Sequence, residues 1–333
     1  MSKERVAKPI PKVIVPLGLF AIILGILGGE WDAWFHVKHE HELLSAPHLV
    51  VIVGLMTFSA MGVLGLAMLK WGNDLSLREK RAMLLVAIGG LATPLALSFD
   101  ELWHRFMGLD QTAWSAPHAI MFAAIAAILI GLAIFTAKHK DSPFSMLFFA
   151  TVILLGLFSF ADFDQPHMSW VKDIRPGFTY PITAAGISTF TLLLMVLLLK
   201  KPGAATIAAS LAWGTHFIIG YSIGAIGGFS HTLPSFPIMI PALALDIALI
   251  LSKNTNFRHD FKSLLALSFF AATVTYWSAI AWSALYTFSQ APQQISGNIQ
   301  DWFIWYLAFI PAASLFIACL AQRFARWFMP HTT

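Results

Sequence analysis

GGEWDAWFHVKHEHELLSAPHLVV, at residues 28–51, is echoed further along the chain by LSFDELWHRFMGLDQTAWSAPHAIMF, at residues 97–122. In each copy an apolar run ends in a carboxylate and a histidine, and a second apolar run begins with Ser-Ala-Pro-His. The matching positions are Asp32 with Asp100, His36 with His104, and Ser45–His48 with Ser115–His118. A repeat that joins the end of one run to the start of the next predicts a duplicated helical hairpin.

Apolar runs of this kind fill the chain. Its 333 residues are 58% hydrophobic and 11% charged, which leaves too little polar surface to cover a water-soluble domain of this size. A membrane-spanning helix needs roughly 20 mostly apolar residues. The segments that qualify are Val13–Gly29, Pro47–Leu69, Met83–Leu102, Pro117–Ala137, Phe144–Phe160, Thr179–Leu199, Ala204–Gly227, Pro237–Leu251, Leu264–Phe288 and Phe303–Phe324.

These segments predict an all-α fold, a polytopic integral membrane helical bundle of about ten transmembrane helices, with the duplicated hairpin in its N-terminal half. We expect residues 1–140 to form a four-helix region that carries the duplicated hairpins. Residues 141–333 would form a further six-helix region, and the two would belong to one continuous membrane bundle.

Basic residues are distributed unevenly between alternate loops. One set of loops, with both terminal segments, carries seventeen of the 21 Lys and Arg residues, and the other set carries Lys38, Arg105, Lys172 and Arg175. Because cytoplasmic loops hold the excess of positive charge, both termini should be cytoplasmic. The loop ends of the two hairpins, which hold the repeated Asp and His residues, should face outward. We expect a multi-pass protein of a bacterial-type inner (cytoplasmic) membrane. The lipid bilayer is then its main partner, and the basic charge does not indicate nucleic acid.

The repeated polar residues have the spacing of metal ligands. Asp and His at positions i and i+4 lie on one helix face, so Asp100 and His104 can reach a common point, as can Asp32 and His36. The next helix opens with Ser as N-cap and Pro in the first turn, and then supplies His118 or His48. Two His and one carboxylate suit copper, iron or zinc and leave coordination positions open. The alternative is a pair of capped hairpins whose His and Asp side chains only satisfy each other.

Two further segments contain His and carboxylate residues and are candidate metal sites. The run from His36 to His41 could load metal, but a solvated loop is the favoured interpretation. A degenerate third copy places Asp162, Asp164 and His167 at the end of another apolar run, yet the following run supplies no His. We interpret that segment as structural. The single cysteine, Cys319, lies inside an apolar run, so a thiolate metal cluster is excluded.

The motif around the second copy resembles a known family. Asp-x-x-Trp-His at residues 100–104, followed by Asp-x-x-x-Trp-Ser-x-Pro-His-x-x-x-Phe at residues 110–122, resembles the C subunit of the copper membrane monooxygenases, the family of particulate methane monooxygenase and ammonia monooxygenase. In that subunit Asp-x3-His-x12-His and Asn-x3-His-x13-His clusters bind copper. Asp100-x3-His104-x13-His118 has the spacing of the second cluster with Asp in place of Asn, and Asp32-x3-His36-x11-His48 is one residue shorter than the first.

The resemblance covers residues 28–135 and implies copper as the cofactor, with iron and zinc as alternatives. It implies oxidation of a small apolar substrate or of ammonia, together with partner subunits or a homo-oligomer. The remainder departs from the family, since ten spans exceed the usual number for that subunit and nothing here looks like the cupredoxin-like domains of its B-subunit partner. Electrons would have to come from a partner, because this chain offers no electron path.

Two ionisable residues in the second half fall inside apolar runs. His216 and Asp246 lie in neighbouring antiparallel segments, where they could meet near the membrane middle as a proton relay or neutralise each other as a structural pair. A metal transporter or metal-sensing membrane protein is therefore the alternative function. A b-type haem protein is less favoured, because its two His ligands face each other from within helices.

Overall fold

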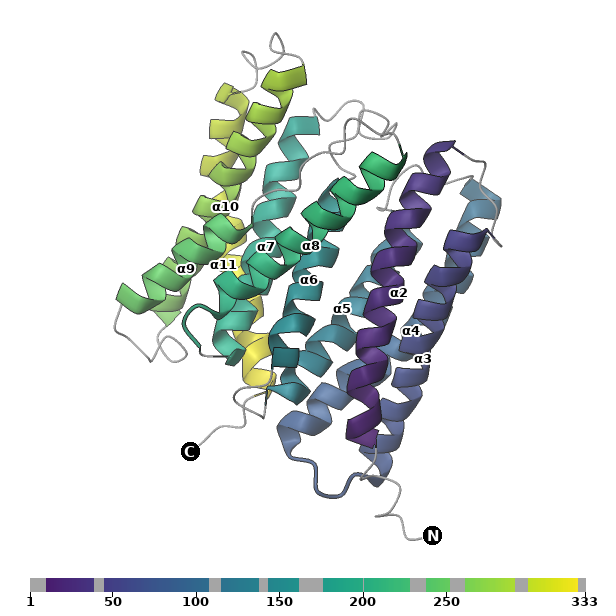
Figure 1. The fold of residues 1–333 in the computed structure, drawn as a ribbon. Coiled ribbons are helices and arrows are strands. Elements are labelled where there is room, and N and C mark those ends of the chain that lie inside the picture. Colours follow the sequence, from purple (N-terminus) through teal and green to yellow (C-terminus); the bar gives the residue numbers. More distant parts are fainter. Residues whose placement is uncertain are drawn as a thin grey trace. The chain divides into compact units, whose positions relative to one another are not determined.

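The computed structural model describes residues 10–38, 45–107, 115–137, 143–161, 176–199, 201–227, 238–251, 261–290 and 299–328. In these residues the chain forms helices and no strand (Figure 1). The helices are α2 Ile10–Lys38, α3 Ala46–Trp71, α4 Leu77–Met107, α5 Ala116–Thr136, α6 Pro143–Ala161, α7 Pro176–Leu199, α8 Ala204–Gly227, α9 Met239–Leu251, α10 Phe261–Gln290 and α11 Ile299–Phe328. The predicted all-α fold is confirmed for this part of the chain.

The helices have the apolar character of a membrane bundle. Within the described residues, five are long and apolar enough to cross a bilayer: α2, α3, α4, α5 and α11. Large apolar side chains stand on their surfaces, among them Val63 (57% exposed), Ile88 (56%) and Leu95 (71%). Such surfaces are costly in water and favourable against lipid chains. A membrane protein is thus supported, while the number of spans and the orientation stay predictions.

Several helices extend beyond the predicted apolar segments. The segment expected at Val13–Gly29 belongs to a helix that continues to Lys38, and the segment expected at Met83–Leu102 belongs to one that runs from Leu77 to Met107. Hydrophobicity marks only the part of a helix that lies in hydrocarbon, whereas backbone hydrogen bonding continues into polar residues at the ends. Asp32 and His36 therefore lie inside α2, and Asp100 and His104 lie inside α4.

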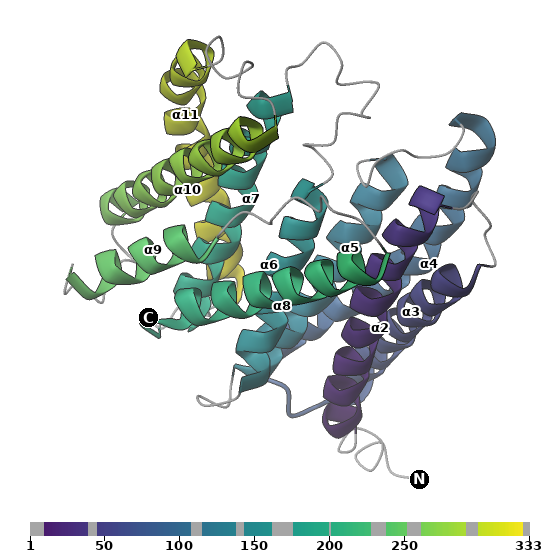
Figure 2. The ribbon, with the colours of Figure 1, turned by 45° about the horizontal axis from the view of Figure 1, so that its top comes forward.

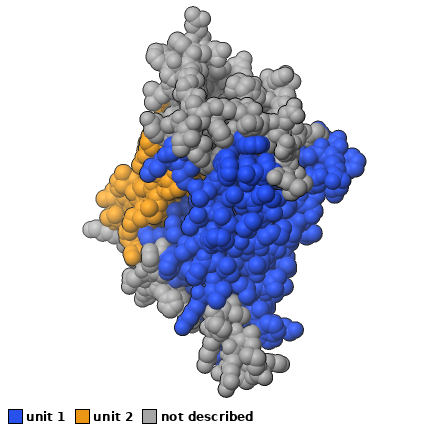
Figure 3. All heavy atoms as spheres, turned by 45° about the vertical axis from the view of Figure 1, so that its right-hand side comes forward, with its two compact units in different colours: residues 1–152, 218–232, 330–333 blue, residues 153–217, 233–329 orange. Residues whose placement is uncertain are grey.

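The chain divides into two compact units, coloured in Figure 3. Unit 1 contains residues 1–152, 218–232 and 330–333, and unit 2 contains residues 153–217 and 233–329. The regional division expected at residue 140 stays a prediction.

In unit 1, each of α2, α3 and α4 packs mainly against the next helix in the chain, and Figures 1 and 2 show α2, α3, α4 and α5 lying together. Glycines allow close approach of these helices. A Cβ atom added to Gly90 would lie 2.5 Å from Cα of Gly62, and one added to Gly131 would lie 2.6 Å from the carbonyl oxygen of Ala82. The contacts between α3 and α4, and between α4 and α5, are therefore backbone against backbone.

A capping box begins α4 and sets where the second hairpin starts. The backbone N–H of Ser76 donates to Oε2 of Glu79 at 2.8 Å, and the Ser76 hydroxyl donates to the same oxygen at 2.5 Å. The Glu79 N–H approaches the Ser76 hydroxyl oxygen at 3.4 Å in return. This reciprocal arrangement satisfies N–H groups that a helix start otherwise leaves exposed.

In unit 2, α7 packs against α10 and α11, and α9 packs against α10. Leu192–Met195 of α7 are fully buried, as is Tyr276 of α10 apart from 1% of its surface. The Ser268 hydroxyl of α10 donates to the carbonyl oxygen of Ser314 in α11 at 3.0 Å. Polar contacts of this kind join helices where lipid offers no competing partner.

Candidate functional site

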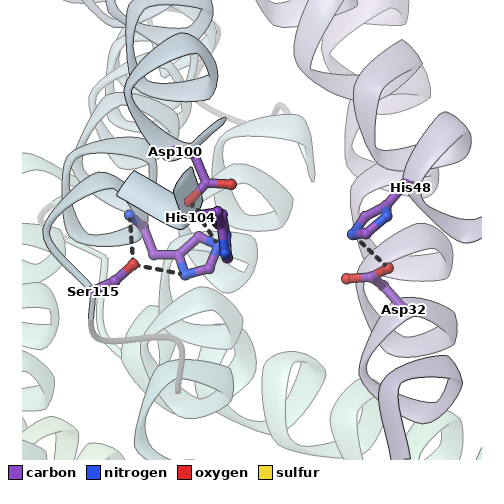
Figure 4. A network of polar contacts seen from close by, with 6 residues as sticks. Asp32, His48, Asp100, His104 and Ser115 are labelled. Atoms are coloured by element: carbon purple, nitrogen blue, oxygen red, sulfur yellow. Dashed lines mark hydrogen bonds and ion pairs between the residues drawn. The ribbon is translucent and has the colours of Figure 1, made fainter. Parts of the chain in front are cut away.

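The repeated polar residues meet at one end of unit 1. Because α2 to α5 alternate in direction, α2 and α4 finish where α3 and α5 begin, and we call this the hairpin-mouth end. Asp100 and His104 occupy the last turns of α4, and His118 the first turn of α5. The same end holds Asp32 of α2 and His48 of α3, and Figure 4 shows the two groups together.

In the second hairpin, two histidines approach one carboxylate oxygen. The Nε2 atoms of His104 and His118 each lie 3.5 Å from Oδ1 of Asp100. The two imidazole rings are 6.5 Å apart between centroids and face each other edge to face. The predicted convergence of these three side chains is therefore present in the structure, with Asp100 between the rings.

In the first hairpin, the described contact joins two residues. Nε2 of His48 lies 3.2 Å from Oδ1 of Asp32, an ion-pair distance at which this oxygen accepts no hydrogen bond among the described residues. His36 lies in α2, but its side chain is outside the described residues, as are residues 39–44. The predicted pairing of Asp32 with His48 is thus present, and the third predicted ligand of this group stays a prediction.

Two serines contact the rings of His118 and His48, and the sequence analysis did not predict these contacts. Ser115 and Ser45 are the N-caps of α5 and α3, as their motif predicts. The hydroxyl oxygen of Ser115 also lies 3.0 Å from Nδ1 of His118, and that of Ser45 lies 3.1 Å from Nδ1 of His48. Each of these rings is therefore held between a serine and a carboxylate. The contact could have been predicted from the three-residue spacing of Ser-x-Pro-His, because this spacing brings an N-cap side chain beside the third residue of its helix.

Both groups are partly shielded from solvent. The side chains of Asp100, His104 and His118 are 18%, 12% and 26% exposed. The ring of Phe122 stacks on His118 at 6.4 Å between centroids, and Trp103 packs edge-on against Phe99 at 5.9 Å. Such partial burial strengthens electrostatic interactions.

An apolar cluster lies beneath the polar residues, further from the hairpin-mouth end. It joins Leu55 of α3, Ala96 of α4 and Met121 of α5, with Val51, Leu97 and Ile125 packed against it. These positions follow His48 and His118, or precede Asp100, by one or two helical turns. The polar groups are therefore followed, towards the middle of the helices, by a layer of packed apolar side chains, which we call the apolar floor.

A nearby ion pair lies on the exposed face of α4. Glu101 and Arg105 form an ion pair on α4 at 2.8 Å, with exposures of 34% and 69%. Because Glu101 directly follows Asp100 yet pairs on the exposed face, it provides a natural comparison for the carboxylate between the histidines. Its ion pair contributes little to stability in water.

The fit to a metal ion is incomplete. Within the described part of the chain, no group of three or more His, Cys, Asp or Glu side chains is arranged to hold a metal ion as it stands. Two of the three separations in the Asp100 group, from its Oδ1 to Nε2 of each histidine, match the separation of ligands on one metal. Two ligands bonded at about 2.1 Å in tetrahedral geometry lie about 3.4 Å apart, close to the 3.5 Å from Asp100 to each histidine.

The structure gives Asp246 a partner other than His216. Oδ2 of Asp246 accepts from the backbone N–H of Thr206 at 2.8 Å and from its hydroxyl at 2.6 Å. Thr206 lies in the first turn of α8, ten residues and about 15 Å along the helix from His216. Asp246 therefore caps α8 instead of meeting His216, although both are buried as expected. A proton relay through His216 and Asp246 stays a prediction. The residues of the degenerate third copy, Asp162, Asp164 and His167, lie outside the described residues.

Comparisons with protein-family models, with curated proteins and with solved structures find no match for this chain.

Proposed function

We propose that this chain is an integral membrane metal-binding protein with copper as its metal. Its main ligands are Asp100, His104 and His118, and a second group consists of Asp32, His36 and His48. By its resemblance to the copper membrane monooxygenase C subunit, it acts with partner subunits in oxidising a small apolar molecule or ammonia. Bound copper would supply the redox chemistry with dioxygen.

The observation that carries the proposal is the position of Asp100. One of its oxygens lies 3.5 Å from two different imidazole nitrogens, which is longer than the usual N–H···O distance of about 2.9 Å and near the separation of two ligands on one metal. Imidazole and carboxylate together are the donor set of copper, iron and zinc sites. The side chains of this chain would hold the ion, and the surrounding aromatic rings would restrict water.

The apolar floor beneath the site favours binding over transport. An ion crossing unit 1 would need polar ligands beyond the hairpin-mouth end, but Leu55, Ala96 and Met121 pack there. In the described part of α4 the next buried polar side chain is Thr93, whose hydroxyl donates to the carbonyl of Gly89 in its own helix at 2.9 Å. The contacts of unit 1 thus support a site reached from one side only.

Metal content of the purified protein tests the proposal directly. The wild type in detergent or nanodiscs, loaded with Cu(II) and desalted, should retain copper, and His104→Ala/His118→Ala should lose most of it because one carboxylate cannot hold the ion alone. His48→Ala should cause a smaller loss, since Asp100 lies between two imidazoles and Asp32 has one described imidazole beside it. Elemental analysis gives the stoichiometry.

The matched control is Glu101→Gln, which removes the neighbouring carboxylate of α4 and should leave copper content unchanged. If the double variant folds normally and keeps wild-type copper stoichiometry and affinity, the proposal is wrong. Copper flux into proteoliposomes that depends on Asp246 would instead establish the transporter alternative.

A further inference from the structure

The start of α4, at the end of unit 1 opposite the hairpin mouths, carries a buried cationic group without a hydrogen-bond acceptor. Two nitrogens of the Arg78 guanidinium, Nε and Nη2, are buried and have no hydrogen-bond partner among the described residues. The neighbouring carboxylate of Glu79 turns back to Ser76 in the capping box. Burial of a guanidinium without hydrogen bonds is costly. The group therefore needs an acceptor that the described residues do not supply.

A second arginine lies on the same face of α4. Arg81 follows Arg78 by three residues, and residues at this spacing are neighbours on a helix. Both arginine residues are partly buried. Two like charges placed side by side repel each other, and an anion between them removes the repulsion. Phosphate is the anion that suits this pair best, because its oxygens accept the parallel N–H groups of a guanidinium.

The arginine pair lies at the level where lipid headgroups are expected. Lys70 and Trp71 end α3, and Nζ of Lys70 lies 5.6 Å from the centroid of the Trp71 ring. Trp and the charged ends of Lys side chains gather at the membrane–water interface. Arg78 is the second residue of α4, directly after the short turn that follows α3. The distribution of basic residues predicts that this end faces the cytoplasm, whose leaflet attracts basic groups through its anionic lipids.

An exposed apolar stripe continues along α4 from the arginine pair towards the membrane middle. It consists of Leu84, Ile88 and Leu91, which are 37%, 56% and 42% exposed. Leu91 lies ten residues, and so about 15 Å, along the helix from Arg81. This length is about half the thickness of the hydrocarbon core. The stripe therefore matches the acyl chains of one leaflet, directly below the two guanidinium groups.

We propose that Arg78 and Arg81 bind the phosphate of an anionic phospholipid whose acyl chains lie along Leu84, Ile88 and Leu91. The charge of the headgroup complements the two arginines, and the apolar stripe complements its chains. Arg78 is partly exposed, and its long side chain can move the guanidinium towards the interface. The inference is independent of metal binding at the hairpin mouths, which lie at the other end of α4.

Lipid binding is measurable by native mass spectrometry of the full chain in detergent, titrated with dioleoyl phosphatidylglycerol. Wild type should bind this lipid more tightly than dioleoyl phosphatidylcholine, whose headgroup is neutral overall. Arg78→Gln should weaken phosphatidylglycerol binding about 10- to 100-fold, as loss of hydrogen bonds to a charged group does. Arg78→Lys keeps the charge but loses the paired N–H groups, so its affinity should lie between those of wild type and Arg78→Gln.

The matched control is Lys80→Gln, which removes one charge from the same turn of α4. Lys80 is exposed, and a cation near a lipid surface contributes only about fivefold through general attraction. Lys80→Gln should therefore lose no more than about fivefold in affinity for phosphatidylglycerol.

The unfolding midpoint in detergent gives a second readout that also reports on folding. Phosphatidylglycerol should raise the midpoint of wild type, because a ligand stabilises the state that binds it. It should not raise the midpoint of Arg78→Gln. Without lipid, Arg78→Gln should be as stable as wild type, since no hydrogen bond of Nε or Nη2 is lost.

Three results would overturn the inference. The first is an affinity of Arg78→Gln for phosphatidylglycerol equal to that of Lys80→Gln, which would show that only general attraction acts. The second is equal binding of phosphatidylcholine and phosphatidylglycerol by wild type. The third is displacement of the lipid by millimolar inorganic phosphate, which would indicate a site for free phosphate instead of a lipid.

Discussion

At the scale of single residues, the position of a carboxylate is explained by what its two oxygens meet. Asp100 presents one oxygen to two histidines. Asp246, only 2% exposed, presents one oxygen to the first turn of α8, and within the described residues its other oxygen, Oδ1, has no hydrogen-bond partner. The first arrangement is suited to a ligand, while the second fastens α9 to the start of α8.

Replacement of Asp246 should therefore affect stability through Thr206. Asp246→Ala leaves a buried N–H and hydroxyl of α8 without their acceptor, which costs about 1–3 kcal/mol. Asp246→Asn should cost less, because its amide oxygen can still accept from both donors. Thermal unfolding in detergent, followed by tryptophan fluorescence, should rank the midpoints as wild type, then Asn, then Ala. Equal midpoints for Asn and Ala would contradict this account.

At the scale of helices, glycine positions decide how closely α3, α4 and α5 approach. Gly62 and Gly90 face each other across α3 and α4, and Gly89 and Gly131 lie against the neighbouring backbones of α5 and α4. Without a hydrophobic driving force between helices in lipid, such close contact is a main source of association. The spacing of the two hairpin mouths depends on it.

Gly90→Ala tests this packing with Gly25→Ala as its control. The added methyl at position 90 would lie 2.5 Å from the Gly62 backbone, whereas at position 25 nothing lies within 4 Å. Overpacking typically costs about 1–3 kcal/mol, so Gly90→Ala should lower the unfolding midpoint. Gly25→Ala should leave it unchanged or raise it slightly, because alanine favours helix. A Gly90→Ala protein as stable as wild type would show that α3 and α4 are not in this contact.

At the scale of the whole molecule, the basic loops predict the orientation of every span. Reporters fused after Thr333, or inserted near Asp74, Lys140 or Ser252, should report the cytoplasm. Insertions near Glu40, Asp110, Lys172 or Gln294 should report the outside. An enzyme active only in the cytoplasm and another active only outside should give opposite signals at each position. Termini on opposite faces would require an odd number of spans and would refute the ten-span arrangement.

The resemblance to the monooxygenase subunit belongs to this scale too. It rests on ligands, aromatics and helix ends within residues 28–135, and the comparisons match no part of the chain. Copper binding at the hairpin mouths can be true without oxygenation, because ligands are local and catalysis needs electrons and substrate from elsewhere. Metal content and oxidation activity should therefore be measured separately.

The sequence by itself determined the helical class and the approximate positions of the helices. It also indicated that Asp100, His104 and His118 face each other in the second hairpin and that Asp32 faces His48 in the first. Apolar runs and i, i+4 spacing are local properties, and the backbone must satisfy its own hydrogen bonds in lipid. The ends of the helices were less predictable, because α2 continues past the predicted Gly29 through Asp32 to Lys38 and α4 continues past the predicted Leu102 through His104 to Met107.

Only the tertiary structure decided which atoms meet. In the structure, one oxygen of Asp100 lies near both histidines, and the capping serines contact the Nδ1 atoms of His48 and His118. Asp246 accepts hydrogen bonds from Thr206 instead of contacting His216. The contacts between helices depend on the axial offset and rotation of neighbouring helices, which hydropathy does not encode, whereas the serine–histidine contacts are local to three residues. In unit 1, glycine contacts allow the close approach of these helices. Spacing along one helix places two side chains on a face, but the partner helix decides what that face meets.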